Sequence, residues 1–464
     1  MTQKGTIGAE DVLDGVEDEL DRDYPVEPEP LDPMDRTRFR RGADVLAATL
    51  IVVVALVVGL VVWLNSDVRA TSSEVNTNPV PSPEPPTVFP PSLGEAWRAP
   101  SPATPVPVAV GPVVVTGNGG EVAGRDPVTG EVLWRYDRDL PLCTIAPSWS
   151  LAVAVYRTSG NFLPDGDSRS GGGCSEVTAF DPASGKRGRQ RAADEPVDKP
   201  NGGQRQGDAE LGTRLLADGT YLTTTGKHLL VTLRSDLVQT MEYGQLPAVV
   251  NPDKQPRTGC EYGTTAVSPG RIGVIERCPG EGSDRLTVYR ATNSDNKADE
   301  PSVVFSTLVE ATGAQLVAMS DQRTAVALPG PSRLVVFDDQ GAQQATYPLE
   351  LPEQDLRGDP DGLVVPTAKG PGAIYWHTGS RTVALHSGDL NPLWTAPNTL
   401  GPGTAFAGRV LVPVRDGIRV LDQATGQEVG TTPVNRDGYS GLVTMSTSGP
   451  MVLEQRGSDL VALR

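Results

Sequence analysis

The feature that most constrains the fold is a short turn motif that recurs after apolar strands. It reads Asp-x-x-Thr/Ser-Gly and occurs at 126–130, 181–185 and 422–426. The aspartate accepts hydrogen bonds from the backbone ahead of it, and the glycine adopts a positive φ. A turn of one type repeated along a chain predicts a repeat architecture. The residues that carry the motif are Asp126, Thr129, Gly130, Asp181, Ser184, Gly185, Asp422, Thr425 and Gly426.

Weaker copies of the strand before this turn extend the repeat. They lie at 229–236, 285–290, 333–341, 382–389 and 459–464, which makes eight copies in all. Between Arg125 and Leu463, seven steps cover 338 residues, about 48 each. Several short strands in each unit of about 40–50 residues are typical of the four-stranded blade of a β-propeller. We therefore predict an all-β, eight-bladed propeller over 93–464, with seven blades as the alternative.

The ends of this predicted domain indicate how the ring closes. The sequence stops at Arg464, directly after the third strand of the eighth copy. Near the start of the domain, GEAWR at 94–98 is similar to GEVLWR at 130–135, which follows the first turn motif. We expect the N-terminal segment to supply the missing outer strand of the last blade, which would remove an open sheet edge.

The repeat also selects a pairing for the four cysteines. Cys143 and Cys260 each precede the first strand of a unit, whereas Cys174 and Cys278 each precede a third strand. Equivalent positions in two units imply the same bridge twice, Cys143–Cys174 and Cys260–Cys278. Disulfides are typical of domains outside the cytoplasm.

The first copy resembles the blade motif of quinoprotein (PQQ-like) β-propellers, because Trp134 follows Asp126, Thr129 and Gly130 at the matching spacing. In that family the tryptophan docks against the neighbouring blade, and Trp394 is a candidate for the same role. The enzymes of the family hold a quinone between a tryptophan and a ring of adjacent cysteines, with a calcium ion nearby. No two cysteines are adjacent here. The resemblance therefore implies a non-enzymatic member without a cofactor, and the arginine-rich, tethered layout resembles actinobacterial envelope proteins.

The N-terminal region predicts a single membrane anchor. Residues 45–64 contain no charge and would span about 30 Å as a helix, the thickness of a hydrocarbon core. Four arginines between 36 and 41 precede this segment, so the positive-inside rule places the N-terminus in the cytoplasm. We predict a disordered acidic cytoplasmic tail at 1–44, and a semi-rigid, proline-rich stalk outside the plasma membrane at 65–92.

Composition narrows the functional classes. A net charge of −18 argues against binding of nucleic acid. The sequence contains no catalytic motif that we recognise, and His377, beside two aromatic residues, is interpreted as a structural histidine. With only three histidines and no CxxC spacing we expect no metal site. The leading hypothesis is a binding or scaffold protein of the cell envelope, whose partner is another envelope protein or a wall component. The alternatives are a PQQ-dependent dehydrogenase and a transmembrane sensor that signals to the acidic tail.

Overall fold

The computed structural model describes residues 41–64, 70–157, 174–192, 214–246, 251–257, 259–293 and 297–464. The chain divides into two compact units, 1–65 and 66–464. Residues 1–40 of the predicted acidic tail, 1–44, lie outside the described residues.

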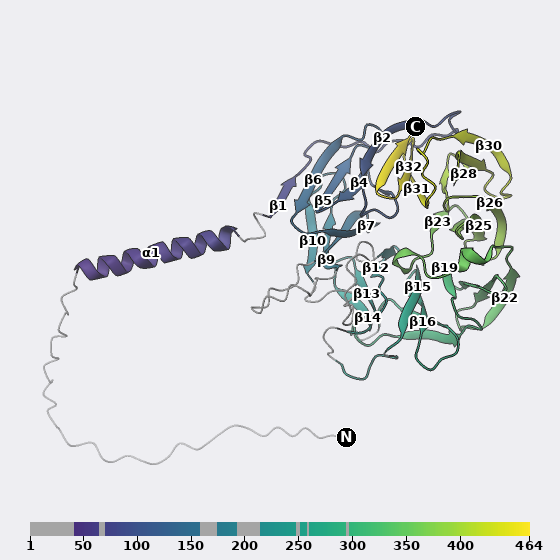
Figure 1. Ribbon diagram of the computed structural model, residues 1–464, viewed down its shortest axis with the longest axis horizontal. Helices are drawn as coiled ribbons and strands as arrows, with labels where there is room; N and C mark the ends of the chain where they lie inside the picture. The colour runs from purple at the N-terminus through teal and green to yellow at the C-terminus, as the bar shows by residue number, and fades with distance from the viewer. Residues whose placement is uncertain are drawn as a thin grey trace, which may run out of the picture. The chain divides into compact units, whose positions relative to one another are not determined.

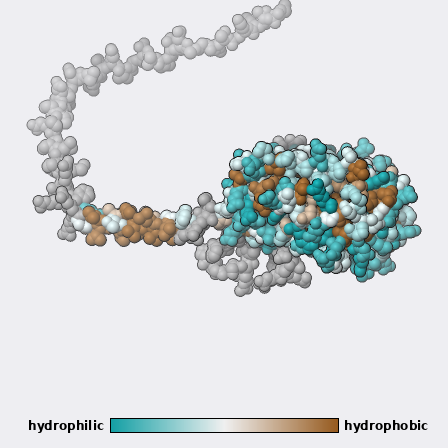
Figure 2. Space-filling model, turned by 90° about the horizontal axis from the view of Figure 1, so that it is seen from above, coloured by the Kyte–Doolittle hydropathy of each residue, from teal (hydrophilic) through white to brown (hydrophobic). Residues whose placement is uncertain are grey.

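Within residues 41–64, the described part of the first unit, the chain forms the helix α1 (Arg41–Leu64). Its segment Gly42–Trp63 is long and apolar enough to cross a membrane. Large side chains along it are exposed, including Leu46 at 73% and Ile51 at 68%. Figure 2 shows the helix as mainly hydrophobic, whereas the second unit is mainly hydrophilic at its surface. Exposed apolar side chains along a whole helix are unfavourable in water, so this helix requires an apolar environment.

The second unit is a ring of eight antiparallel sheets (Figure 1). Blade 1 contains β3 (Val108–Val110), β4 (Val113–Asn118), β5 (Glu121–Arg125) and β6 (Val132–Arg138); blade 2 contains β7 (Leu142–Ser148), β8 (Leu151–Arg157), β9 (Cys174–Phe180) and β10 (Arg187–Ala192); blade 3 contains β11 (Leu215–Ala217), β12 (Tyr221–Thr224), β13 (Leu229–Arg234) and β14 (Gln239–Gly244); blade 4 contains β15 (Glu261–Ser268), β16 (Arg271–Arg277), β17 (Arg285–Arg290) and β18 (Val303–Leu308).

The second half of the ring continues the pattern. Blade 5 contains β19 (Gln315–Met319), β20 (Thr324–Leu328), β21 (Arg333–Phe337) and β22 (Gln343–Pro348); blade 6 contains β23 (Thr367–Gly370), β24 (Ala373–His377), β25 (Arg381–His386) and β26 (Pro392–Pro397); blade 7 contains β27 (Thr404–Phe406), β28 (Arg409–Val414), β29 (Gly417–Leu421) and β30 (Glu428–Pro433); blade 8 contains β31 (Val443–Ser448), β32 (Met451–Arg456), β33 (Asp459–Leu463) and β2 (Glu95–Pro100). Two 3-10 helices, η1 (Glu353–Leu356) and η2 (Asp361–Leu363), lie between blades 5 and 6.

Eight blades are therefore confirmed, and each of the eight predicted repeat strands is the third strand of a blade. The expected closure is also confirmed. β2 pairs antiparallel with β33, with Trp97 opposite Ala462 and Pro100 opposite Asp459. The segment that precedes the propeller in sequence thus supplies the outer strand of its last blade.

The core lies between neighbouring blades. One cluster joins Val115 and Trp134 of blade 1 to Ile145, Ala154 and Phe180 of blade 2, and all five are buried. Because both faces of each sheet pack against a neighbour, strands such as β20 are buried at every position. Apolar burial on this scale is the main force that holds the ring together.

The proline-rich segment differs from the predicted stalk. β1 (Thr71–Glu74) pairs antiparallel with β6 as a fifth strand of blade 1. Between 80 and 89 only every third residue, namely Val80, Pro83, Pro86 and Phe89, is withdrawn from solvent. This period is that of polyproline II, which has three residues per turn. The segment is therefore not the free stalk that we expected, because one ridge of it packs on the propeller.

We call residues 76–93 the strap. Asn76 donates its backbone N–H to Ser184 of blade 2, and Val80 packs on the core shared by blades 1 and 2. Phe89 meets Phe406 of blade 7 edge to face, with ring centroids 6.4 Å apart. The strap therefore links blades on both sides of the seam at which β2 closes the ring.

The meander gives the ring two distinct ends. We call "turn face" the end that carries the turns between first and second and between third and fourth strands. We call "loop face" the end that carries the connections between second and third strands and those that pass to the next blade. The strap contacts lie at the turn face.

Candidate functional site

The residues of the predicted turn motif form the expected turns at the turn face. The Asp126 carboxylate accepts hydrogen bonds from the backbone N–H groups of Val128 (2.9 Å) and Thr129 (2.8 Å). Gly130 has a φ of +76° and donates to the carbonyl of Asp126. The same pattern recurs at Asp181, Ser184 and Gly185 and at Asp422, Thr425 and Gly426.

Each of these three turns receives a tryptophan from the fourth strand of the preceding blade. Trp134 of blade 1 donates its Nε1–H to the carbonyl of Pro182 at 2.7 Å and lies over Gly185, where a Cβ atom would meet the ring at 2.4 Å. Trp394 makes the equivalent bond to Gln423 at 3.1 Å, and Trp97 to Pro127 at 2.8 Å. The glycine at the fifth position of the motif is therefore required by inter-blade packing as well as by the turn.

Both predicted disulfides are present, and both lie at the loop face. Cys143–Cys174 joins the first and third strands of blade 2, with Cα atoms 6.0 Å apart. Cys260–Cys278 joins the residue before β15 to the residue after β16, with Cα atoms 4.1 Å apart. Each bridge holds together chain segments at the end of the ring where the long connections emerge.

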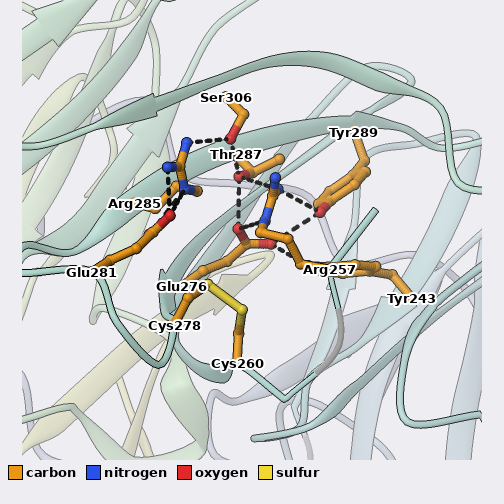
Figure 3. A network of polar contacts seen from close by, with 10 residues as sticks. All are labelled: Tyr243, Arg257, Cys260, Glu276, Cys278, Glu281, Arg285, Thr287, Tyr289 and Ser306. Atoms are coloured by element: carbon orange, nitrogen blue, oxygen red, sulfur yellow. Dashed lines mark hydrogen bonds and ion pairs between the residues drawn. A yellow bond between two sulfur atoms is a disulfide. The ribbon is translucent and has the colours of Figure 1, made fainter. Parts of the chain in front are cut away.

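A buried carboxylate beside the second disulfide organises the contact between blades 3 and 4 (Figure 3). The Glu276 side chain is fully buried. One carboxylate oxygen accepts Arg257 Nε (2.8 Å) and Thr287 Oγ1 (2.8 Å), and the other accepts the hydroxyls of Tyr243 (2.5 Å) and Tyr289 (2.9 Å). Each oxygen of the Glu276 carboxylate therefore accepts two hydrogen bonds.

The electrostatics of this network favour a fixed charge pair. Burial, reinforced by the Glu276 carboxylate, raises the pKa of Tyr289, so its hydroxyl remains a donor. Burial alone would lower the pKa of Arg257, but Glu276 outweighs it and the pKa is raised. The four donors come from blade 3, from blade 4 and from the connection between them, so the network holds these two blades together.

Arg–Glu pairs of this kind recur around the ring. Glu454 of β32 is fully buried and accepts two bonds from Arg436 (2.9 and 2.6 Å) and one from Arg456 (2.8 Å). Glu176 of β9 pairs with Arg138 at the end of β6. Arg138, Arg257 and Arg436 each come from the end of one blade or the connection after it, and each meets a carboxylate of the next blade.

Sequence reasoning missed these pairs, although a signal was present. Glu276 and Glu454 interrupt otherwise apolar strands, VIER and VLEQ. A carboxylate that the strand pattern places in the interior needs a cationic partner, since an isolated buried charge is very costly. The partner could not have been identified, because it is supplied by a connection whose path the sequence does not reveal.

His377 is buried in the structure. It ends β24, is 6% exposed, and its Nδ1 lies 3.3 Å from Thr399 Oγ1. Burial lowers its pKa to about 4, although Asp355 acts in the opposite direction. The imidazole is therefore neutral at physiological pH and fills a site between blade 6 and the connection to blade 7.

The connection between blades 5 and 6 bridges four consecutive blades at the loop face. Gly362 accepts a hydrogen bond from Thr225 of blade 3, and Asp359 forms an ion pair with Arg277 of blade 4 at 2.6 Å. Gly358 accepts one from Gln315 of blade 5, and Asp355 accepts one from Thr378 of blade 6. This loop is therefore part of the rigid surface.

An open polar cleft lies at the loop face between blades 7 and 8, with a volume of about 540 Å³. Its rim includes Arg415 and Asp416 of the β28–β29 turn, and its far side includes Tyr439 and Ser440. Arg436 lines the cleft, and its guanidinium is held by Glu454 beneath it. Arg415 and Ser440 are exposed. The cleft thus offers exposed polar groups on a rigid base.

Comparisons with known proteins find only distant structural similarity. No protein-family model and no curated protein matches the chain. Among solved structures, Sqt1 of Saccharomyces cerevisiae is 10% identical, with a TM-score of 0.46, and the match covers 82% of this chain and 99% of that one. The dihydro-heme d1 dehydrogenase NirN is 13% identical, with a TM-score of 0.42, covering 79% and 78%. AztD of Citrobacter koseri is 12% identical, with a TM-score of 0.43, covering 74% and 88%. At these values the matches carry no argument about function, and the eight blades rest on the sheet topology.

Proposed function

We propose that this protein is a membrane-anchored binding or scaffold protein of the cell envelope, which engages a partner through the loop face of its propeller. The observation that carries the proposal is the bracing of that face. Both disulfides, three inter-blade Arg–Glu pairs and the loop that bridges four blades are located there. A preorganised surface loses little entropy when it binds, so bracing of this kind favours affinity.

The opposite face is less suited to the role. The chain's own strap already packs there, from Asn76 on blade 2 to Phe89 on blade 7. The short turns at that face serve inter-blade packing, as the tryptophan contacts of three blades demonstrate. This leaves the loop face, with its polar cleft, as the better candidate for a partner.

Three features support the location. The exposed apolar side chains of α1 fit a lipid environment, and the two disulfides fit an oxidising compartment. The arginines before the helix favour a cytoplasmic N-terminus. The propeller would then lie outside the plasma membrane, within reach of other envelope proteins and the wall.

Cross-linking in intact cells, followed by purification of the full-length protein, tests the proposal. The chain offers a matched pair of exposed arginines, Arg415 at the loop face and Arg290 at the turn face. We expect a specific partner to co-purify with the wild type and with Arg290→Glu, and to be lost with Arg415→Glu. Equal recovery with both variants, or no specific partner in repeated experiments, would contradict the proposal.

A further inference from the structure

The fourth strand of each blade is its outer edge, and open edges invite pairing with other chains. All eight of these strands lie in the described part of the chain. In seven of them the edge is covered, charged or interrupted by proline. The remaining one, β18 (Val303–Leu308) of blade 4, has none of these protections from the residues that the structure describes.

Two blades show which backbone groups point outward. Each fourth strand begins with a one-residue bulge, so positions can be counted from it. In β14 the N–H groups at the second and fourth positions, Glu242 and Gly244, donate outward to Ala298 (2.7 Å) and to the Gln255 side chain (2.9 Å). In β6 the same positions, Arg135 and Asp137, face β1.

In four of the other fourth strands, proline occupies one of the two positions whose N–H would point outward. The fourth residue after the bulge is Pro100 in β2, Pro348 in β22, Pro397 in β26 and Pro433 in β30. Proline has no N–H, so it removes the donor that would bind an added strand. In β10 the edge instead carries Arg187, Arg189 and Arg191.

In β18 the second and fourth positions after the bulge are Ser306 and Leu308, so both outward N–H groups are retained. The strand contains no charged residue and no proline. Val303 is 39% exposed and Leu308 is 49% exposed, so apolar side chains flank the open backbone groups. β1 on β6 demonstrates that the outer strand of this repeat accepts a fifth antiparallel strand after its bulge.

We propose that the edge of β18 binds an extended, uncharged segment of another protein, which adds to blade 4 as a fifth strand opposite Ser306 and Leu308. The apolar exposure of Leu308 favours an aliphatic residue opposite it. Another protein is favoured over a second copy, because residues 66–464 contain 45 acidic and 34 basic residues, a net charge of −11, and two such propellers repel each other. This surface is separate from the loop face and goes beyond the function proposed above.

Leu308→Pro is the decisive variant, since it places proline where four other blades already have it. The probe is a fluorescein-labelled hexapeptide of alternating valine and threonine with neutral ends, and fluorescence anisotropy measures its binding to the full-length protein in detergent. We expect the wild type to bind it and Leu308→Pro to bind it about tenfold more weakly, the loss of one strand hydrogen bond. No binding to the wild type, or equal binding by both proteins, would overturn the proposal.

A second probe keeps the test valid if Leu308→Pro fails to fold. The same peptide, N-methylated at alternate residues, cannot donate the strand hydrogen bonds, and we expect it not to bind the wild type. Binding as tight as that of the unmodified peptide would overturn the proposal. So would a dimer of the full-length protein that Leu308→Pro dissociates, because the occupant would then be a second copy.

Discussion

Replacing Trp134 tests whether tryptophan docking holds neighbouring blades together. Trp134 is 1% exposed, stacks on Phe180 and donates to the Pro182 carbonyl of the next blade. Truncation to alanine leaves a large cavity and an unpaired carbonyl, and such changes cost about 3–5 kcal/mol. Phenylalanine keeps much of the ring but loses the hydrogen bond, which costs about 1–2 kcal/mol.

These free energies predict modest but measurable shifts in melting temperature. The propeller, residues 70–464, has an unfolding entropy of roughly 0.8 kcal/mol/K at about 2.1 cal/mol/K per residue. Trp134→Ala should therefore lower the melting temperature by about 4–6 °C and Trp134→Phe by about 1–3 °C. Trp394→Ala should have a smaller effect than Trp134→Ala, because Trp394 is only half-buried. Calorimetry of the full-length protein in detergent measures all three. A shift below about 1 °C for Trp134→Ala would refute the docking argument.

Three further predictions concern the loop face, and thermal or denaturant unfolding measures each of them. Glu276→Ala should cost about 3–5 kcal/mol, because Arg257 is left without its buried partner; an effect within 0.5 kcal/mol, about that of a surface substitution, would refute the network. In the unfolded chain the His377 imidazole takes up a proton below about pH 6.5, whereas in the folded protein it does so only near pH 4. The free energy of unfolding should therefore decrease by about 3 kcal/mol as the pH falls from 6.5 to 4. His377→Gln should flatten that pH dependence, and an unchanged profile would contradict it. Replacing Cys143 and Cys174 with alanine should cost about 3–4 kcal/mol for the loop that they close, and no loss would argue against a structural bridge.

Most of the fold could be predicted because the repeat signal is local. Asp126 and Gly130 specify a turn through their own side chain and backbone, so spacing alone locates the third strands and the blade count. Closure by the segment around Trp97 could also be predicted, since it repeats the sequence that follows the first turn.

What the sequence did not reveal depends on contacts between distant segments. Nothing local to Val80 or Phe89 distinguishes a docked polyproline segment from a free one, because docking requires matching surfaces on blades 1 and 2 and on blade 7. Arg257 and Arg436 are ordinary surface-type residues in sequence, and only the path of their loops brings each to a buried glutamate. The cleft beside Tyr439 arises in the same way, from two connections that meet.

The most direct test of the central claim is a residue-resolved cross-linking map in intact cells. A photo-reactive amino acid is placed at Ser440 in the loop-face cleft or at Asp389 in a turn of the opposite face. We predict that Ser440 gives one dominant adduct with an envelope component and that Asp389 gives none above background. Adducts at Asp389 alone, or the same products from both positions, would contradict the assignment of the loop face as the binding surface.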